Sequence, residues 1–166
     1  MSEIHIADTG LLVAAGQPSN PRYKALRRYA RRNEVVFVVP ERVYEELTTE
    51  DGDADPPAVD TAIDEGWVEV ADSLDYTEPL VSKAMDGVQR YVANADDRQA
   101  DEVERADAAL AGHAAQALAT GSATHAYIYT TDIAAGEGAE AVLADEGYGD
   151  AVTFVNGFTL LEDLVE

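Results

Sequence analysis

The sequence predicts an α/β protein of three layers, in which helices cover both faces of a five-stranded parallel sheet. Three observations support this fold class. Five short apolar runs, either rich in β-branched residues or alternating, have the pattern of strands. Amphipathic helical patterns separate these runs. An aspartate stands directly after the first run and another just beyond the fourth. Such alternation favours a parallel sheet whose crossovers are right-handed.

The predicted strands are residues 4–7, 35–39, 67–70, 126–129 and 152–155. Helical patterns are clearest over residues 23–32, 41–48, 81–92 and 103–118. Residues 48–60 combine acids, glycine and a Pro-Pro pair without periodicity, so we expect a solvated loop or the entry to a short helix. The chain has 166 residues, 46% of them hydrophobic, and no internal repeat. We therefore expect residues 1–166 to form a single domain.

The charge of the chain is unusual, because 33 acidic residues stand against 11 basic ones and give a formal net charge of −22. Self-repulsion of this size opposes folding at ordinary ionic strength. At about 1 M salt the screening length falls to roughly 3 Å, and most of the repulsion disappears. The acidic excess, with arginine preferred to lysine, is typical of proteins from halophiles that accumulate salt. A single Asp or Glu therefore carries little functional information here.

Several classes of protein are disfavoured by what the sequence lacks. It contains no cysteine, which excludes disulfides, thiolate metal sites and cysteine nucleophiles. No apolar run approaches the roughly 18 residues that a membrane helix needs. The N-terminus does not have the pattern of a secretory signal. We expect a cytoplasmic protein without a membrane segment.

Two aspartates are placed where parallel sheets bind ligands. Asp8 directly follows the first predicted strand, and Asp132 comes just after the fourth, in the run Ile-Tyr-Thr-Thr-Asp. Ligands of open parallel sheets bind beyond the carboxyl ends of the strands, where the strand order reverses. If strands one and four are neighbours, Asp8 and Asp132 face one crevice.

Two further carboxylates interrupt helical stripes that are otherwise apolar. Asp107 lies in register with Leu110 and Ala114, and Glu46 lies on the apolar side of the helix at 41–48. A carboxylate turned toward a core is costly unless it meets a cation. A simpler interpretation is that Asp8 and Asp132 cap helix N-termini while Glu46 and Asp107 lie at the solvent edges of their helices.

Four clustered carboxylates would suit a hard cation such as Mg²⁺, which binds through a few carboxylates, waters and substrate phosphates. Such ions can position a water for in-line attack on a phosphodiester, without a histidine or serine nucleophile. The three histidines form no cluster in the sequence, and we expect each to be structural or exposed. HExxH, GxGxxG and phosphate-loop motifs are absent.

Segments along nearly the whole chain resemble the PIN-domain family. The resemblance rests on IADTGLL at the first strand, VVPERVYEEL at the second strand and its helix, ERADAALAGHAAQAL on a later helix, YIYTTD at the fourth strand, and the closing VTFVNGFTLLEDL. It implies a sheet order of 3-2-1-4-5 and cleavage of RNA that depends on Mg²⁺ or Mn²⁺.

The resemblance also implies roles for individual residues. The metal ligands would be Asp8, Glu46, Asp107 and Asp132, and the hydroxyls of Thr9 and Thr131 would orient the site or position water. Glu45 adjoins Glu46 and is an alternative ligand. Glu137 could replace an acid that the family often carries after the fourth aspartate, although a surface role suits it better. Homodimers are common in the family, so we expect one here.

One segment of the acidic chain is strongly basic. Six of the eleven basic residues fall within residues 22–32, RYKALRRYARR. On a helix, four of them share a broad face, while Tyr23, Leu26 and Ala30 point inward; these four are Lys24, Arg28, Arg31 and Arg32. An RNA backbone is the partner that this face predicts. Pairing with nearby acids, or contact with a second subunit, is the alternative.

The sequence thus predicts a metal-dependent endoribonuclease, with a noncatalytic PIN-like module that binds nucleic acid or protein as the alternative. A phosphate-accepting receiver domain is disfavoured, because the paired acids after strand one and the late lysine of that class are absent. Within the nuclease interpretation, a toxin inhibited by a cognate antitoxin and a nuclease for RNA processing or decay both remain open.

Overall fold

The computed structural model of the protein describes residues 2–50, 57–95 and 105–165, with their side chains except at positions 50, 95 and 105–107. It contains a five-stranded, all-parallel sheet in the order β3-β2-β1-β4-β5, as the sequence and its resemblance predict. The strands are β1 (Glu3–Ala7), β2 (Phe37–Val39), β3 (Val68–Val70), β4 (His125–Thr130) and β5 (Val152–Asn156). Ends of the predicted strands shift by one or two residues.

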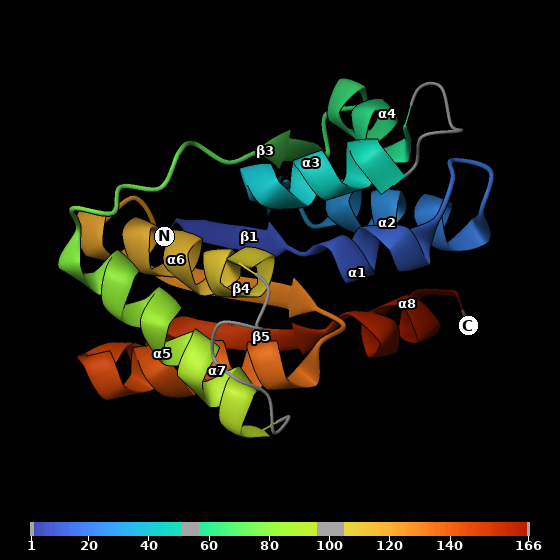
Figure 1. Ribbon diagram of the computed structural model, residues 1–166. Helices are drawn as coiled ribbons and strands as arrows, with labels where there is room; N and C mark the ends of the chain where they lie inside the picture. The colour runs from blue at the N-terminus through green and yellow to red at the C-terminus, as the bar shows by residue number, and fades with distance from the viewer. Residues whose placement is uncertain (1, 51–56, 96–104, 166) are drawn as a thin grey trace.

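Helices cover both faces of this sheet (Figure 1). Those before β3 are α1 (Thr9–Ala15), α2 (Pro21–Arg32), α3 (Glu41–Glu50) and α4 (Ala58–Asp64). The later ones are α5 (Pro79–Ala95), α6 (Arg105–Thr120), α7 (Ile133–Leu143) and α8 (Gly157–Val165), with a π-type turn, η2 (Ala144–Tyr148), and a 3₁₀ turn, η3 (Gly149–Ala151), before β5.

Two helices go beyond the sequence prediction. The chain turns into α1 immediately after Asp8 and begins α2 only at Pro21, so two helices stand where one was expected. Within predicted loop 48–60, residues 48–50 continue α3 and Ala58 begins α4, while residues 51–56 lie outside the described part. Ala58, Val59 and Ala62 of α4 are buried, because this short helix packs one apolar side inward.

The sheet separates two apolar cores. On one face, Tyr23 and Leu26 of α2 pack with side chains of α1, α3, α4 and α8. On the other face, Leu110 and Ala114 of α6 pack with α5, α7 and Ile128 of β4. The strands all run in the same direction, and α1 and α7 begin where β1 and β4 end (Figure 1). This carboxyl edge is therefore the place where side chains from several elements meet.

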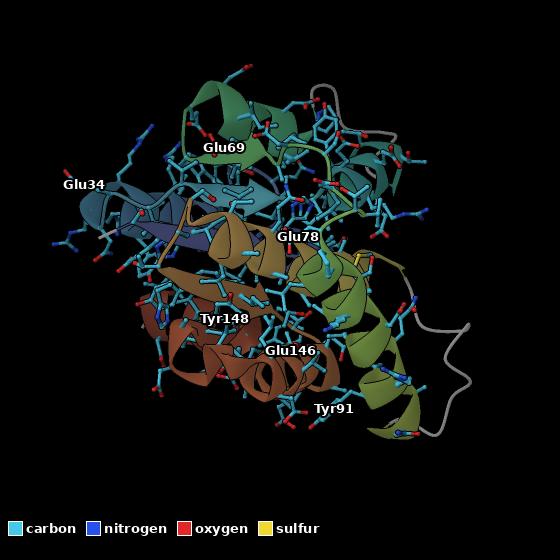
Figure 2. The ribbon with its side chains drawn as sticks, turned by 90° about the vertical axis from the view of Figure 1, so that its left-hand side faces the viewer. Glu34, Glu69, Glu78, Tyr91, Glu146 and Tyr148 are labelled. Carbon is cyan, nitrogen blue, oxygen red and sulfur yellow. The ribbon has the colours of Figure 1, made fainter. Side chains whose placement is uncertain are left out.

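The surface carries acids from many parts of the chain. Figure 2 labels Glu34, Glu69, Glu78 and Glu146, which come from separate parts of the chain. Among the described residues only three ion pairs are formed, between Arg27 and Glu65 at 2.5 Å, His5 and Glu3 at 3.2 Å, and Lys83 and Glu146 at 3.9 Å. Pairing with bases therefore leaves most of the negative charge uncompensated, as expected of a protein that folds in concentrated salt. None of the helices in the described ranges is both long and apolar enough to cross a lipid bilayer.

Candidate metal and nuclease site

Asp8 lies at the centre of a polar cluster at the carboxyl edge. It follows β1 directly, is only 7% exposed and caps the N-terminus of α1. Its Oδ1 accepts a hydrogen bond of 3.0 Å from the backbone N–H of Leu11. Its Oδ2 accepts a short hydrogen bond from the hydroxyl of Thr130 at the end of β4. The capping role that the sequence allowed is thus present, and it leaves lone pairs free on both oxygens.

Burial raises the pKa of Asp8 above its ordinary value. Hydrogen bonds from the Thr130 hydroxyl and from the backbone N–H groups of Leu11 and Thr131 oppose this rise, whereas the charge of Asp132 adds to it. Among the described residues, no Lys, Arg or His forms an ion pair with Asp8. The ionised carboxylate is therefore a buried charge in need of a cation.

Asp132 belongs to the same cluster. Its backbone N–H donates to the Thr130 hydroxyl at 3.0 Å, so one hydroxyl links both aspartates. The Asp132 carboxylate caps α7 by accepting from the N–H of Ala135 at 3.1 Å. Glu137 lies on the second turn of α7 and is exposed.

Glu46 is oriented toward the cluster by the threonine next to Asp8. The Thr9 hydroxyl donates to Oε2 of Glu46 at 2.7 Å, and Glu46 is half-buried. Glu45 is exposed and instead lines a cavity of about 630 Å³ between α3, α5 and α6. The geometry therefore favours Glu46 over Glu45 as the acid that faces Asp8.

Thr130 is the residue that the sequence reasoning missed. Thr131 was expected to supply a hydroxyl; in the described contacts its backbone N–H approaches Asp8, and its side chain packs over Gly10 and Gly157. A Cβ at Gly10 would collide with the Thr131 hydroxyl, so this glycine allows α1 and β4 to approach closely. Strand alternation could have indicated Thr130, because it lies two residues after the buried Ile128 and shares its side of the sheet.

Asp107 is the least defined of the four expected ligands. It lies on the first turn of α6, in register with the buried Leu110 and Ala114, but its side chain is outside the described residues. In the side chains that are described, no three His, Asp or Glu residues are grouped closely enough to hold a metal ion. The structure thus brings Asp8, Asp132, Glu46 and Thr9 to one edge and does not test the fourth carboxylate.

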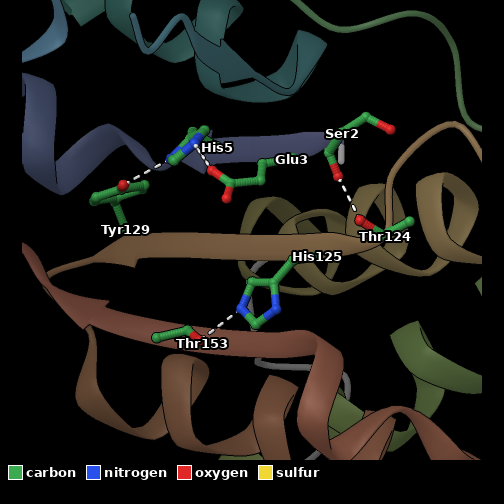
Figure 3. Close-up of polar contacts among 7 residues, drawn as sticks. All are labelled: Ser2, Glu3, His5, Thr124, His125, Tyr129 and Thr153. Carbon is green, nitrogen blue, oxygen red and sulfur yellow. Dashed lines mark hydrogen bonds and ion pairs between the residues drawn. The ribbon is translucent and has the colours of Figure 1, made fainter. Parts of the chain in front are cut away.

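The histidines have partners other than the Asp8 cluster, and Figure 3 shows two of them, His5 and His125, with the residues that they bond. His5 Nδ1 bonds the hydroxyl of Tyr129 at 2.8 Å, and its ring stacks on Tyr127 with centroids 4.7 Å apart. His125, the first residue of β4, bonds Thr153 at 2.8 Å. His113 is 6% exposed on α6. None of them contacts the carboxylates at the carboxyl edge within the described contacts, in keeping with structural roles.

Burial of His113 predicts a loss of stability in acid. Burial lowers the pKa of His113 to about 4, although Glu41 and Asp72 act in the opposite direction. The unfolded chain binds the proton near its ordinary pKa of about 6.5, so it binds more protons than the folded state as the pH falls from there toward 4. Between about pH 7 and about pH 5, wild type should lose about 2 kcal/mol more stability than His113→Gln. Urea denaturation at constant KCl measures this difference, and parallel pH profiles would contradict it.

The fold and the edge cluster define a PIN-type α/β domain: a parallel 3-2-1-4-5 sheet with aspartates after the neighbouring strands β1 and β4. The whole chain, residues 1–166, matches the family described as Halobacterial PIN domain, and the protein belongs to that family. PIN domains are generally nucleases, which makes this chain a nuclease-type module, and the halobacterial family agrees with the acidic composition. Comparison with curated proteins and with solved structures gives no significant match.

Proposed function

We propose that the protein is a metal-dependent endoribonuclease that hydrolyses RNA phosphodiester bonds at the carboxyl edge of its sheet, in a salt-rich cytoplasm. The observation that supports this most strongly is Asp8, a buried carboxylate without a described cationic partner beside a second aspartate. A capping role alone does not require burial, since exposed aspartates cap helices equally well. A bound divalent cation would offset the cost of burying this charge.

The available donors fit a hard divalent ion. All are carboxylate oxygens, which suit Mg²⁺ or Mn²⁺ better than softer metals. Asp8, Glu46, Asp107 and Asp132 would hold the ion, with Asp107 contributed by the first turn of α6. When bound, it would supply an activated water for in-line attack and stabilise the leaving oxygen.

The hydroxyl groups of the chain keep these carboxylates in place. Thr9 donates to Oε2 of Glu46, and among the described residues the other oxygen of that carboxylate accepts no side-chain hydrogen bond. Thr130 donates to Asp8 and, through its oxygen, accepts from the backbone of Asp132. Such outer hydrogen bonds fix the direction of ligand lone pairs and are commonly worth about 10–100-fold in metal affinity or activity.

The test is cleavage of a pool of structured and single-stranded RNAs in concentrated KCl, with Mg²⁺ or Mn²⁺ against EDTA. Asp132→Asn keeps the cap of α7, because Asn caps as well as Asp, but removes a ligand charge; we expect a loss of about 100-fold or more. The matched control is Asp145→Asn, which makes the same change at an exposed position in η2. Wild type that is folded and cuts no RNA with either metal would replace the proposal by a noncatalytic binding module.

A further inference from the structure

The outward face of α2 is a cationic surface formed by Lys24, Arg28, Arg31 and Arg32. All four side chains are exposed, whereas Tyr23 and Leu26 of the same helix are buried. Among the described residues none of the four forms an ion pair. Together with Arg27 they line a hollow of about 350 Å³ whose walls are entirely Lys and Arg. Local pairing with acids therefore does not account for these charges in the described part of the chain.

Arg27 differs from the other four. Its guanidinium donates to Glu65 at 2.5 Å, and its side chain is 27% exposed. It thereby attaches α2 to the end of α4 and fixes the orientation of the helix. The fold thus holds the cationic surface in a defined position. Less conformational entropy is then lost when a partner binds to it.

The rest of the molecule makes α2 the natural approach for a polyanion. The helix has no acid in its twelve residues, although acids occupy 33 of 166 positions in the chain. Outside α2, the bases with described side chains are Arg42, Lys83 and Arg90, which stand singly on α3 and α5. A strongly acidic body repels RNA everywhere else, so productive contact needs a local reversal of sign.

The cationic surface lies on the opposite face of the sheet from α6. Tyr23 and Leu26 pack in the core on the α1 and α8 side. Thr130, which bonds Asp8, instead points to the same face of the sheet as Ile128, which packs in the core under α6. The seven-residue α1, about 10 Å long at 1.5 Å per residue, separates the end of β1 from the start of α2. An RNA strand that contacts both the cationic surface and the carboxylates must pass around the carboxyl edge of the sheet.

We propose that α2 anchors the RNA backbone at a site separate from the carboxylates, so that the protein prefers strands long enough to reach both. Only the cleavage test of this inference rests on the proposed function; the binding test does not. Binding is measured with metal-independent fluorescence anisotropy of a labelled RNA of about 20 nucleotides in EDTA, over the KCl range in which the protein stays folded. Arg28→Gln with Arg31→Gln should reduce the slope of log affinity against log salt by about 1.4, at about 0.7 per lost contact.

The matched control is Lys83→Gln with Arg90→Gln, which removes the same charge from α5 and should leave the slope unchanged. Circular dichroism establishes that both double variants are folded. Equal slopes for the two variants, or no RNA binding by folded wild type at any salt, would overturn the proposal. A third outcome would also overturn the proposal: light scattering shows that wild type is a dimer and the α2 variant a monomer, while the two bind RNA with equal affinity. In that case α2 would contact the acidic surface of a second copy of the chain.

Cleavage of RNAs of two lengths provides the second test of the proposal. Relative to wild type, the α2 variant should cut the long RNA about tenfold more slowly, yet cut a tetranucleotide at the same rate. Equal losses on both lengths would show that α2 does not act as a distant anchor. If no RNA is cut at all, the endoribonuclease proposal fails, while the binding slopes in EDTA still decide the role of α2.

Discussion

Asp8→Asn is expected to raise the free energy of unfolding of the metal-free protein and to abolish metal-dependent cleavage. Asp8 is 7% exposed, and burial raises its pKa. A raised carboxyl pKa means that the folded state binds more protons than the unfolded chain between the two pKa values, so ionisation at neutral pH lowers stability. Asn removes this charge and keeps the hydrogen bond from Leu11 that caps α1.

Urea denaturation in concentrated KCl with EDTA measures the first effect, and titration with Mg²⁺ or Mn²⁺ measures the second. A metal at about 100 times its dissociation constant should stabilise wild type by about 2.7 kcal/mol and leave Asp8→Asn unchanged. Asp145→Asn, at an exposed position, should stay within about 0.5 kcal/mol of wild type and retain the metal response. If Asp8 were only a cap, Asp8→Asn would respond to the metal as wild type does, because Asn caps a helix as well as Asp.

Glu65→Ala is expected to lower the free energy of unfolding by about 2–4 kcal/mol. Glu65 accepts hydrogen bonds from the Tyr23 hydroxyl and the Arg27 guanidinium at 2.5 Å each, and from Trp67 Nε1 at 3.3 Å. Tyr23 and Trp67 are almost fully buried, so truncation leaves their polar groups without a partner. Burial raises the pKa of Glu65, but the three hydrogen bonds outweigh it and the net pKa is lowered, as expected of a charge that the fold stabilises.

Urea denaturation at constant KCl measures this loss. Asp64→Ala is the matched control, because it truncates the neighbouring exposed acid and should change stability by no more than about 0.5 kcal/mol. Glu65→Gln keeps an acceptor for Tyr23 but loses the charge that pairs with Arg27, so it should fall between wild type and Glu65→Ala. Equal stability of Glu65→Ala and Asp64→Ala would show that the network contributes nothing in concentrated salt.

These two carboxylates show why acids are hard to interpret in this chain. Asp8 and Glu65 are both partly or wholly buried, yet one lacks a described cation and the other receives three donors. Composition cannot separate them, since acids are abundant everywhere. Position in the sequence identified only Asp8 and Asp132 as candidate site residues, because a residue at the carboxyl end of a strand has a defined place in a parallel sheet.

The sequence by itself determined the five strands, the direction of the sheet and the inward side of α2, because apolar periodicity reports which side of an element is buried. Resemblance to PIN domains supplied the strand order, which local patterns do not contain. Only the tertiary structure decided that Thr130 bonds Asp8, that Thr9 orients Glu46 and that Arg27 is held by Glu65. Those contacts join residues 37 to 122 positions apart, and their geometry depends on how separate elements pack, which no local pattern in the chain specifies.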